Sequence, residues 1–501
     1  MASSVKSIGI IGAGIAGLST AKILKSFGFD VTVFEKEAEV GGVWSASRRY
    51  PGLTTQNPRT TYEFSDYPMP SDWPEWPAGK QVQSYLESYA KHFGFYDRVL
   101  LQAEVERVEY NGEVAQWFVH LKQAGQSDAA QKPTYQFDFL IACNGIFSLP
   151  SIPPFEGRDQ FIDGGGLLCH TSQFTNIEQA RGKHVLVVGY GKSSCDVANS
   201  VCDISASTQV IARTLIWKMP KKLKNILNFK YLFLTRLGEG LFRYVRLKGF
   251  EKFLHGRGLF IRNGMLNSVE AVIAKQLKLD QLDLRPKKPL ESIARSTVSL
   301  VTEGFYEKIQ QGKLVVRQTF ITQLRPGEAV LSGGEVLPAD IIICGTGWHQ
   351  SVPFFSQDVL ARICDSNGNF RLYQTMMPVA VPKLAFNGYN SSFFSQLNCE
   401  IGALWLADYL LGGVSLPSEK EMNDYIDERL AWMEERTDGK HSKGTNIIPF
   451  SVHQMDEILN DMRLPLSPIV RLQQWFLPVT GSDYRPLTKR LQQRYGINSS
   501  H

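Results

Sequence analysis

Ser7-Ile-Gly-Ile-Ile-Gly12-Ala-Gly14-Ile-Ala-Gly17 sets the architecture of the chain. Its first five residues are mostly apolar and predict a buried strand, and Leu18 to Phe27 shows the periodicity of a helix. The three glycines permit a tight turn, a close approach of the backbone to a pyrophosphate and close packing of the helix on the strand. Because a helix N-terminus favours an anion, this stretch predicts the phosphate turn of a dinucleotide-binding unit.

An acidic residue and a second pair of glycines extend this first nucleotide site. A strand is predicted over Asp30 to Phe34, and it ends at Glu35, 23 residues after Gly12, where a carboxylate can bind ribose hydroxyls. Glu37-Ala-Glu-Val-Gly-Gly42-Val-Trp44 follows and resembles the second glycine element of FAD-binding flavoproteins. The residues predicted to bind the first cofactor are Gly12, Gly14, Gly17, Glu35, Gly42 and Trp44.

A second nucleotide site begins 177 residues after the first. His184-Val-Leu-Val-Val188 predicts a strand, Gly189-Tyr-Gly191-Lys-Ser-Ser194 the turn, and Cys195 to Val201 the helix. The next predicted strand, Gln209 to Ala212, ends at Arg213, whose guanidinium can bind a 2′-phosphate that an acid would repel. The unit therefore predicts NADPH rather than NADH. Its predicted ligand residues are Gly189, Gly191, Ser193, Ser194 and Arg213, with Lys192, Thr214 and Lys218 as weaker candidates.

Two further segments repeat one pattern. Asp138-Phe-Leu-Ile-Ala-Cys-Asn-Gly145 and Asp340-Ile-Ile-Ile-Cys-Gly-Thr-Gly347 each run from an aspartate through an apolar strand to a glycine. Such strand ends suit chain crossings beside bound dinucleotides, so Gly347 joins the predicted ligand set. The alternative is that both are core strands that end in ordinary turns.

Composition excludes several other classes of protein. The 501 residues are 43% hydrophobic and 21% charged, as is usual for a globular protein, and no run of about 18 apolar residues predicts a membrane span. The seven cysteines are odd in number and include no CxxC pair, which predicts free thiols and a cytoplasmic location. No Ser-His-Asp set and no metal-ligand cluster stands out, so we expect no metal site.

One basic segment, 216–262, departs from this average composition. It contains 12 basic and two acidic residues, interleaved with aromatic side chains, and predicts a helix or helix pair with one apolar and one basic face. The simpler interpretation is a solvated basic face over a packed aromatic face. The alternative is a peripheral membrane contact or an apolar substrate entrance. Nucleic-acid binding is not expected, because no recognised module accompanies the charge.

Together, these motifs resemble those of the flavin-containing monooxygenase family of class B flavoprotein monooxygenases, especially its plant-like members. The family fingerprint F-x-G-x-x-x-H-x-x-x-[F/Y] is matched at Gly166, His170 and Phe174, although Gly164 replaces the leading aromatic residue. Phe174 favours the flavin monooxygenase branch, because Baeyer–Villiger monooxygenases carry a tryptophan there. The resemblance spans roughly residues 8 to 410 and includes Tyr62-Glu-Phe-Ser-Asp66-Tyr-Pro68.

The resemblance implies two doubly wound, Rossmann-like α/β domains. The FAD-binding domain is expected to be discontinuous, over 1–165 and 330–450. The NADP-binding domain is expected to be inserted into it over 166–329, with the basic aromatic insertion 216–262. Residues 451–501 are expected to form a C-terminal extension. His170 is expected to belong to the linker between the domains rather than to transfer protons.

The resemblance also implies a reaction. NADPH reduces FAD, the reduced flavin forms a C4a-hydroperoxyflavin with O2, and this species oxygenates a nitrogen or sulfur nucleophile of a small molecule. One specific form would be N-hydroxylation of a primary amine or amino acid. Family members place an asparagine near the flavin C4a, and Asn57 in Thr54-Thr-Gln-Asn57-Pro-Arg is similar, with one residue fewer before Asp66 than in many relatives. Asn57 could instead be a turn residue before Pro58.

Three other functions compete with this interpretation. A Baeyer–Villiger ketone monooxygenase is the neighbouring enzyme class, and a non-catalytic, redox-sensing flavoprotein is the alternative of another class. A flavin disulfide reductase would share both nucleotide sites, but the absence of CxxC opposes it. The sequence leaves the substrate and the oligomeric state open.

Overall fold

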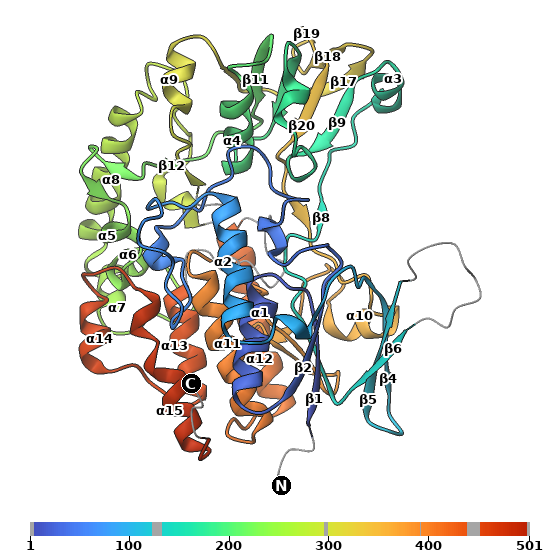
Figure 1. The fold of residues 1–501 in the computed structure, drawn as a ribbon. Coiled ribbons are helices and arrows are strands. Elements are labelled where there is room, and N and C mark those ends of the chain that lie inside the picture. Colours follow the sequence, from blue (N-terminus) through green and yellow to red (C-terminus); the bar gives the residue numbers. More distant parts are fainter. Residues whose placement is uncertain (1–4, 123–132, 295–298, 391, 438–450, 498–501) are drawn as a thin grey trace.

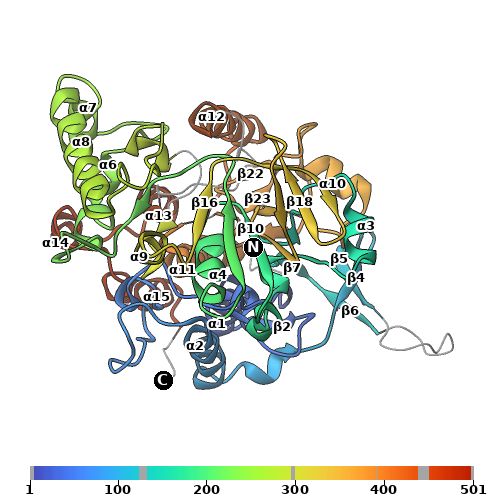
Figure 2. The ribbon, with the colours of Figure 1, turned by 90° about the horizontal axis from the view of Figure 1, so that it is seen from above.

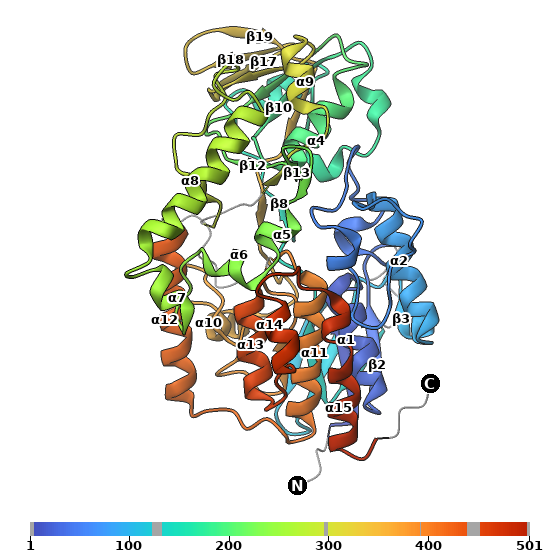
Figure 3. The same ribbon diagram turned by 90° about the vertical axis from the view of Figure 1, so that its left-hand side faces the viewer.

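The computed structural model describes residues 5–122, 133–294, 299–390, 392–437 and 451–497. Two α/β units, each built on a parallel sheet, lie one above the other, and helices from the end of the chain cover one side of the lower unit (Figures 1 and 3). The predicted α/β class with two Rossmann-like units is confirmed.

The first unit is organised around the strand that precedes the first glycine turn. Its sheet has the order β24-β7-β1-β2-β3, and every neighbouring pair is parallel. Helix α1 follows β1 and packs on the later helix α11, which is buried along nearly its whole length. The bounds are β1 Ser7–Ile11, β2 Asp30–Phe34, β3 Val99–Leu100, β7 Phe139–Ala142, β24 Leu384–Phe386, α1 Ile15–Ser26, α2 Gly79–His92 and α11 Ser395–Leu410.

The second unit repeats the same plan. Its sheet has the order β16-β11-β10-β20-β9, again with parallel pairs only, and α4 leaves the turn after β10 (Figure 2). The bounds are β9 Leu167–His170, β10 His184–Val188, α4 Lys192–Val201, β11 Ser207–Ile211, β16 Val315–Arg317 and β20 Ile341–Cys344.

The two segments that share a sequence pattern occupy equivalent places. β7 pairs with β1 in the first sheet, and β20 pairs with β10 in the second. Asp138 Oδ2 accepts a hydrogen bond from Ser7 N at 3.0 Å, and Asp340 Oδ2 accepts one from His184 N at 2.7 Å. Each aspartate therefore holds the start of the central strand of its own sheet.

The sheet pairing differs from the division expected at 329/330. β20 was expected in the first domain, yet it lies inside the second sheet, with Val185 opposite Ile341. The chain returns towards the first unit only after β21 (Trp348–His349), which pairs antiparallel with β8 (Leu149–Pro150). The expected end of this domain at residue 450 lies outside the described residues.

Smaller elements complete both units. The other strands are β4 Val105–Asn111, β5 Gln116–Leu121, β6 Thr134–Phe137, β12 Lys218–Met219, β13 Lys222–Leu223, β14 Leu227–Asn228, β15 Ser299–Leu300, β17 Ile321–Arg325, β18 Glu328–Leu331, β19 Val336–Pro338, β22 Leu372–Tyr373 and β23 Met377–Pro378. The other helices are α3 Arg158–Asp163, α5 Lys230–Phe233, α6 Arg236–Gly240, α7 Phe250–Leu254, α8 Leu259–Gln276, α9 Phe305–Gln310, α10 Gln357–Ile363, α12 Glu419–Thr437, α13 Ser451–Asp461, α14 Pro468–Gln473 and α15 Pro486–Arg494.

The basic insertion 216–262 does not form the predicted helix or helix pair but consists of several short strands and helices. It contains β12 to β14, three short helices, α5 to α7, and the start of α8. Residues 241–249 separate α6 from α7, and Gly249, at a φ of +51°, directly precedes α7. Phe229 and Tyr244 are buried, whereas Phe253 and Phe260 are exposed, so the insertion combines a packed aromatic side with an exposed one. None of the described helices is long and apolar enough to cross a membrane.

An ionic cluster docks this insertion on α13. His453 Nε2 lies 2.8 Å from Glu251 Oε1, its Nδ1 lies 2.5 Å from Glu239 Oε1, and its ring stacks on Tyr244 at 4.4 Å. Burial alone would lower the pKa of His453, but the hydrogen bonds and charges of Glu239 and Glu251 outweigh it and raise the pKa to about 10. His453 is therefore an imidazolium that holds two carboxylates together.

We predict that His453→Gln lowers the free energy of unfolding by about 3 kcal/mol at pH 6, because two buried carboxylates lose their cation. The folded-state pKa is raised, so the contribution of His453 is fully present below about pH 6.5 and is lost as the pH rises through 10. Urea unfolding across this range should show the difference between variant and wild type shrinking. Arg246→Gln, which breaks an exposed ion pair with Glu428, should cost less than about 1 kcal/mol. A difference independent of pH would contradict the assignment.

Candidate functional site

The first glycine turn is shaped by contacts that leave no room for side chains. Gly12 has a φ of +106°, and a Cβ on Gly17 would lie 1.8 Å from the Gly12 carbonyl oxygen. Gly14 is the N-cap of α1 and provides no side-chain cap, and the first turn of α1 contains no acid. The N–H groups at this end of α1 are therefore available to an anion, which fits the pyrophosphate of a dinucleotide.

The second glycine pair packs directly on this turn. Gly41 N donates to Ala13 O at 3.0 Å, and a Cβ on Gly42 would lie 3.1 Å from Gly14 Cα. Trp44 follows in the same short helical turn and is buried, with its ring edge-to-face against Tyr62 at 5.8 Å. The structure thus brings these predicted residues to one place.

Glu35 lies at the same turn and is buried. Its Oε2 accepts a hydrogen bond from Ala13 N at 2.7 Å, and its Oε1 accepts one from Glu37 N at 3.0 Å. Burial raises the pKa of Glu35, while these two backbone donors oppose the rise. The Glu35 carboxylate therefore stabilises the glycine turn through Ala13 N–H, and it lies where the ribose of a dinucleotide is expected.

Asn57 is buried between its own loop and a segment that crosses the start of α1. Its Nδ2 donates to Phe393 O, and Thr55 Oγ1 donates to the Asn57 carbonyl at 2.7 Å. The segment carrying Phe393 touches α1 at Gly388, where an added Cβ would lie 2.6 Å from Ala16 Cβ. Asn57 is thus tied to a segment that packs against the first helical turn, the part of α1 nearest the expected dinucleotide.

The second turn repeats the geometry of the first. Gly189 has a φ of +111°, and a Cβ there would lie 2.6 Å from Gly345 O. Ser194 is buried, and its Oγ donates to the same carbonyl at 3.3 Å, so a small residue suffices where the third glycine was expected. Gly191 caps α4 without a side-chain hydrogen bond, an added Cβ would meet nothing within 4 Å, and Ser193 follows in the first turn. This open helix end also fits a pyrophosphate.

Arg213 stands beside the second turn. Gly189 N donates to the carbonyl oxygen of Ile211, the last residue of β11, at 2.9 Å. Arg213 follows two residues after Ile211 and is exposed to solvent. Within the described part of the chain its guanidinium forms no ion pair, so it remains available to a phosphate. Thr214 is exposed next to it.

Two of the weaker candidates have other partners. Lys192 Nζ pairs with Asp196 within α4. Lys218 is 1% exposed, and its Nζ donates to Tyr190 O at 2.7 Å and to Ser299 Oγ at 3.3 Å. Burial lowers the pKa of Lys218. Lys218 therefore stands behind the turn, held by protein groups, and is not placed to bind a phosphate directly.

The crossing after β20 contributes a residue that the sequence analysis missed. Gly345 N donates to Val188 O at 2.8 Å, and its carbonyl meets both Gly189 and Ser194. Gly347 lies further on, at a φ of +88°, and its carbonyl accepts a hydrogen bond from Ser151 N at 3.0 Å in the crossing between the units. The signal for Gly345 was its place directly after an apolar strand.

His170 occupies the same crossing. Its Nδ1 lies 2.9 Å from Ser172 Oγ, and its ring packs edge-to-face on Trp348 at 4.6 Å. Burial lowers the pKa of His170 to about 4, so the ring is neutral near pH 7. This environment fits a structural role in the linker.

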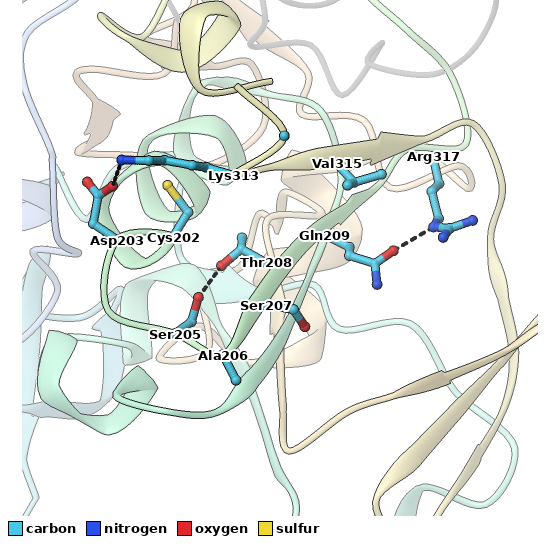
Figure 4. A pocket seen from close by; sticks show the side chains of 11 residues that line it. Cys202, Asp203, Ser205, Ala206, Ser207, Thr208, Gln209, Lys313, Val315 and Arg317 are labelled. Carbon is cyan, nitrogen blue, oxygen red and sulfur yellow. Dashed lines mark hydrogen bonds and ion pairs between the residues drawn. The ribbon is translucent and has the colours of Figure 1, made fainter. Parts of the chain in front are cut away.

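A pocket of about 350 Å³ lies elsewhere, at the outer edge of the second sheet (Figure 4). β11 and β16 supply much of its lining, including Gln209 and Arg317, whose side chains are hydrogen-bonded to each other. None of the predicted site residues lines it, so it is separate from the two glycine turns.

A family model, related sequences and solved structures all indicate similarity to monooxygenases. A family model described as FMO-like, flavin-binding monooxygenase-like, matches residues 5–466, which extends the predicted similarity towards the C-terminus. Probable flavin-containing monooxygenase 1 of Arabidopsis thaliana is 27% identical, over 95% of this chain and 96% of that protein. Among solved structures, S-allyl-L-cysteine S-oxygenase from Allium sativum has a TM-score of 0.64 at 20% identity, covering 99% of this chain and 95% of that one. Cyclohexanone monooxygenase from Rhodococcus sp. Phi1 bound to NADP+ has a TM-score of 0.66 at 15% identity, covering 91% and 97%.

We predict that Arg213→Ala raises the Kd for NADPH about 10- to 100-fold, the loss expected for a charge-assisted hydrogen bond to phosphate. The Kd for NADH should change less than about twofold, because NADH lacks the 2′-phosphate. Titrating both coenzymes into the purified variant measures the two effects. Arg181→Ala, a change at an exposed arginine paired with Glu178, is the matched control and should leave both values unchanged. Equal weakening of NADPH and NADH by Arg213→Ala would contradict the assignment.

Proposed function

The chain belongs to the flavin-binding monooxygenase-like family and is an oxidoreductase, and from this premise we propose an FAD-dependent NADPH:oxygen monooxygenase acting on a nitrogen or sulfur nucleophile of a small molecule. The observation that carries the proposal is the pair of glycine turns, each followed by a helix without a side-chain cap. An acid accompanies the first turn and an exposed arginine the second, which suits FAD and NADPH respectively.

The assignment of binding residues follows from matching the first turn with FAD and the second with NADPH. The FAD-binding set is Gly12, Gly14, Gly17, Glu35, Gly42 and Trp44, and the NADPH-binding set is Gly189, Gly191, Ser193, Ser194, Arg213 and Gly347. We assign the first unit to the FAD domain and the second to the NADP domain, with β20 included in the second because of its pairing with β10.

The chain's own residues would bind, orient and exclude water. FAD, once reduced by NADPH, supplies the activation of O2. A buried Asn57, held by Phe393 O, would present its amide to the flavin in a site that solvent reaches poorly. Exclusion of water matters because water and protons would divert the activated oxygen to peroxide.

The nature of the oxygenated atom needs a direct experiment. The neighbour from Allium sativum is titled an S-oxygenase, and the Rhodococcus neighbour is a ketone-oxygenating enzyme by its name, but both likenesses are at the level of fold. Phe174 is buried and stands where Baeyer–Villiger enzymes carry tryptophan, which favours N- or S-oxygenation. N-hydroxylation of a primary amine or amino acid is one specific form of the proposal.

The decisive assay screens NADPH oxidation with amines, amino acids, thioethers and ketones, and measures product mass and peroxide together. Substrate-dependent NADPH use with gain of one oxygen atom on nitrogen or sulfur is expected. Oxygen insertion into ketones alone would establish the Baeyer–Villiger alternative. A full complement of FAD without any substrate-dependent O2 uptake would instead indicate a non-catalytic redox sensor.

We predict that Asn57→Ala lowers kcat at least tenfold and releases most of the NADPH-derived electrons as peroxide, because the flavin loses a fixed hydrogen-bonding group. Peroxide formed per NADPH consumed is the measurement. Asn225→Ala, an exposed asparagine in the insertion, is the control and should behave as wild type. An unchanged peroxide fraction in Asn57→Ala would leave Asn57 as a turn residue only.

A peripheral membrane contact through 216–262 is the second part of the proposal. Phe250, Phe253 and Phe260 are exposed on α7 and α8, and Phe250 lies 6.1 Å from Trp475, beside the exposed Phe476 after α14. The helices α7 and α8 and the segment that contains α14 lie side by side at one margin of the molecule (Figures 1 and 2). The exposed charged residues between 243 and 265 are all basic, because the acid Glu251 is buried against His453. Exposed aromatic rings among basic side chains suit an anionic lipid surface.

We predict that the wild-type chain co-sediments with vesicles containing phosphatidylserine and less with neutral vesicles, since about 1 kcal/mol is gained per basic residue near an anionic surface. The double change Phe260→Ser with Phe476→Ser should lower binding at least tenfold. Phe320→Ser, an exposed aromatic residue in the second unit, is the control and should bind as wild type. Equal binding by all three proteins would exclude this surface.

A further inference from the structure

A buried lysine, Lys218, donates a hydrogen bond to the backbone of the second glycine turn. Lys218 Nζ lies 2.7 Å from Tyr190 O, the carbonyl in the middle of the turn, and 4.5 Å from the centre of the Tyr190 ring. Burying a cation is costly unless protein groups replace its water. Here the water around the Lys218 ammonium is replaced by the Tyr190 carbonyl of the turn and by Ser299 Oγ at 3.3 Å. The position of the turn and the position of Ser299 are therefore linked through one ammonium group.

Ser299 belongs to a short strand that also reaches the first unit. β15 (Ser299–Leu300) pairs in parallel with β12, so Lys218 lies opposite Ser299. Leu300 is paired with Met219 in the same strands, and its N–H points away from β12 and donates to Gln56 Oε1 at 3.1 Å. Gln56 is 244 residues away in the sequence and belongs to the loop of the first unit. This hydrogen bond joins the two units next to Asn57.

The loop that carries Gln56, residues 50–57, contacts a segment beside each nucleotide turn. Tyr50 Oη lies 3.5 Å from Asp196 Oδ2 on α4, the helix that leaves the second turn. Asn57 follows Gln56 directly, and its Nδ2 donates to Phe393 O beside α1. Three hydrogen bonds, joined by the chain neighbours Ser299–Leu300 and Gln56–Asn57, thus connect the carbonyl of the second turn to Asn57.

We propose that Lys218 and Gln56 are positioning residues that couple occupancy of the second nucleotide turn to the placement of Asn57. The inference rests on the proposed function, because it takes the second turn as the NADPH site and Asn57 as the group near the flavin. A coenzyme pyrophosphate would fix the turn and its Tyr190 carbonyl, which fixes Lys218, β15 and the Gln56 amide in sequence. Asn57 would then be held in place when the coenzyme is bound, the moment at which water must be excluded. By linkage, ordering the Asn57 loop would strengthen coenzyme binding by the same factor.

A purely structural staple between the units is the competing explanation. A staple would hold the Asn57 loop equally with and without coenzyme, whereas the coupling makes the loop respond to the coenzyme. The two explanations therefore differ in what NADP+ does to the loop, and a chain of contacts alone does not separate them.

Hydrogen exchange on the full-length, FAD-loaded chain separates them. NADP+ is expected to slow amide exchange in peptides covering 186–194 and 52–62 of the wild type. In Gln56→Ala the protection of 186–194 should persist, while the protection of 52–62 should fall at least threefold. Gln56→Glu keeps an acceptor for Leu300 N–H and should restore the protection. Gln209→Ala, which removes an amide bound by Arg317 at the outer edge of the same sheet, is the matched control and should behave as wild type.

Turnover and coenzyme affinity supply a second pair of readouts, and loss of a staple that does not respond to the coenzyme would leave the affinity unchanged. Gln56→Ala should raise the peroxide formed per NADPH about fivefold and, by the same linkage, raise the Kd for NADP+ about threefold. Lys218→Met should raise both. A double variant should release no more peroxide than the worse single variant, because both residues act in one series. Multiplying effects in the double variant, or NADP+ protection of 52–62 unchanged in Gln56→Ala, would overturn the coupling. Absence of NADPH oxidation by the wild type would instead reject the proposed function, while the exchange experiment would still report on the coupling.

Discussion

Both units depend on a helix that begins at a glycine with no side chain to cap it. At the first turn, α1 approaches the Gly12 carbonyl so closely that a Cβ on Gly17 would lie 1.8 Å from it. At the second, α4 is brought in by Ser194, whose hydroxyl reaches the carbonyl of Gly345. In each case the first helical N–H groups are left without a side-chain acceptor from the protein cap, and an anionic ligand can satisfy them. The crossing segments after β7 and β20 pack on these two turns, Glu35 binds the first, and Arg213 lies beside the second.

The repeated unit also explains how the two sites meet. β7 and β20 leave their central strands at equivalent points, and the segments that follow them form β8 and β21, which pair with each other between the units. The loop carrying Asn57 spans the same region and touches α4 through Tyr50 and β15 through Gln56. One face of the first unit is thus built against the second, which is the arrangement needed for two dinucleotides to exchange electrons in a site shielded from water.

The sequence predicted what local periodicity and glycine spacing determine. β1, β2 and β10 have the bounds expected from the apolar runs, and both glycine turns start the helices expected there. The membership of β20 in the second sheet was not predictable locally, because Ile341 to Cys344 would fit the core of either sheet. The insertion was predicted as a helix or helix pair, whereas the structure has three short strands, three short helices and the start of α8 there. Lys218 was considered for the phosphate, but its burial depends on Tyr190 and on Ser299, 81 residues away, and such distant partners leave no local signal.

The flavin content of the purified chain is the most direct test of the whole account. We expect about one FAD per wild-type chain by visible absorbance and no FAD in Gly17→Ala, whose Cβ would strike the Gly12 carbonyl. Gly191→Ala should retain full FAD, because its Cβ meets no protein atom within 4 Å. A colourless wild-type protein that FAD cannot reconstitute would contradict it, as would equal loss of FAD in both glycine variants.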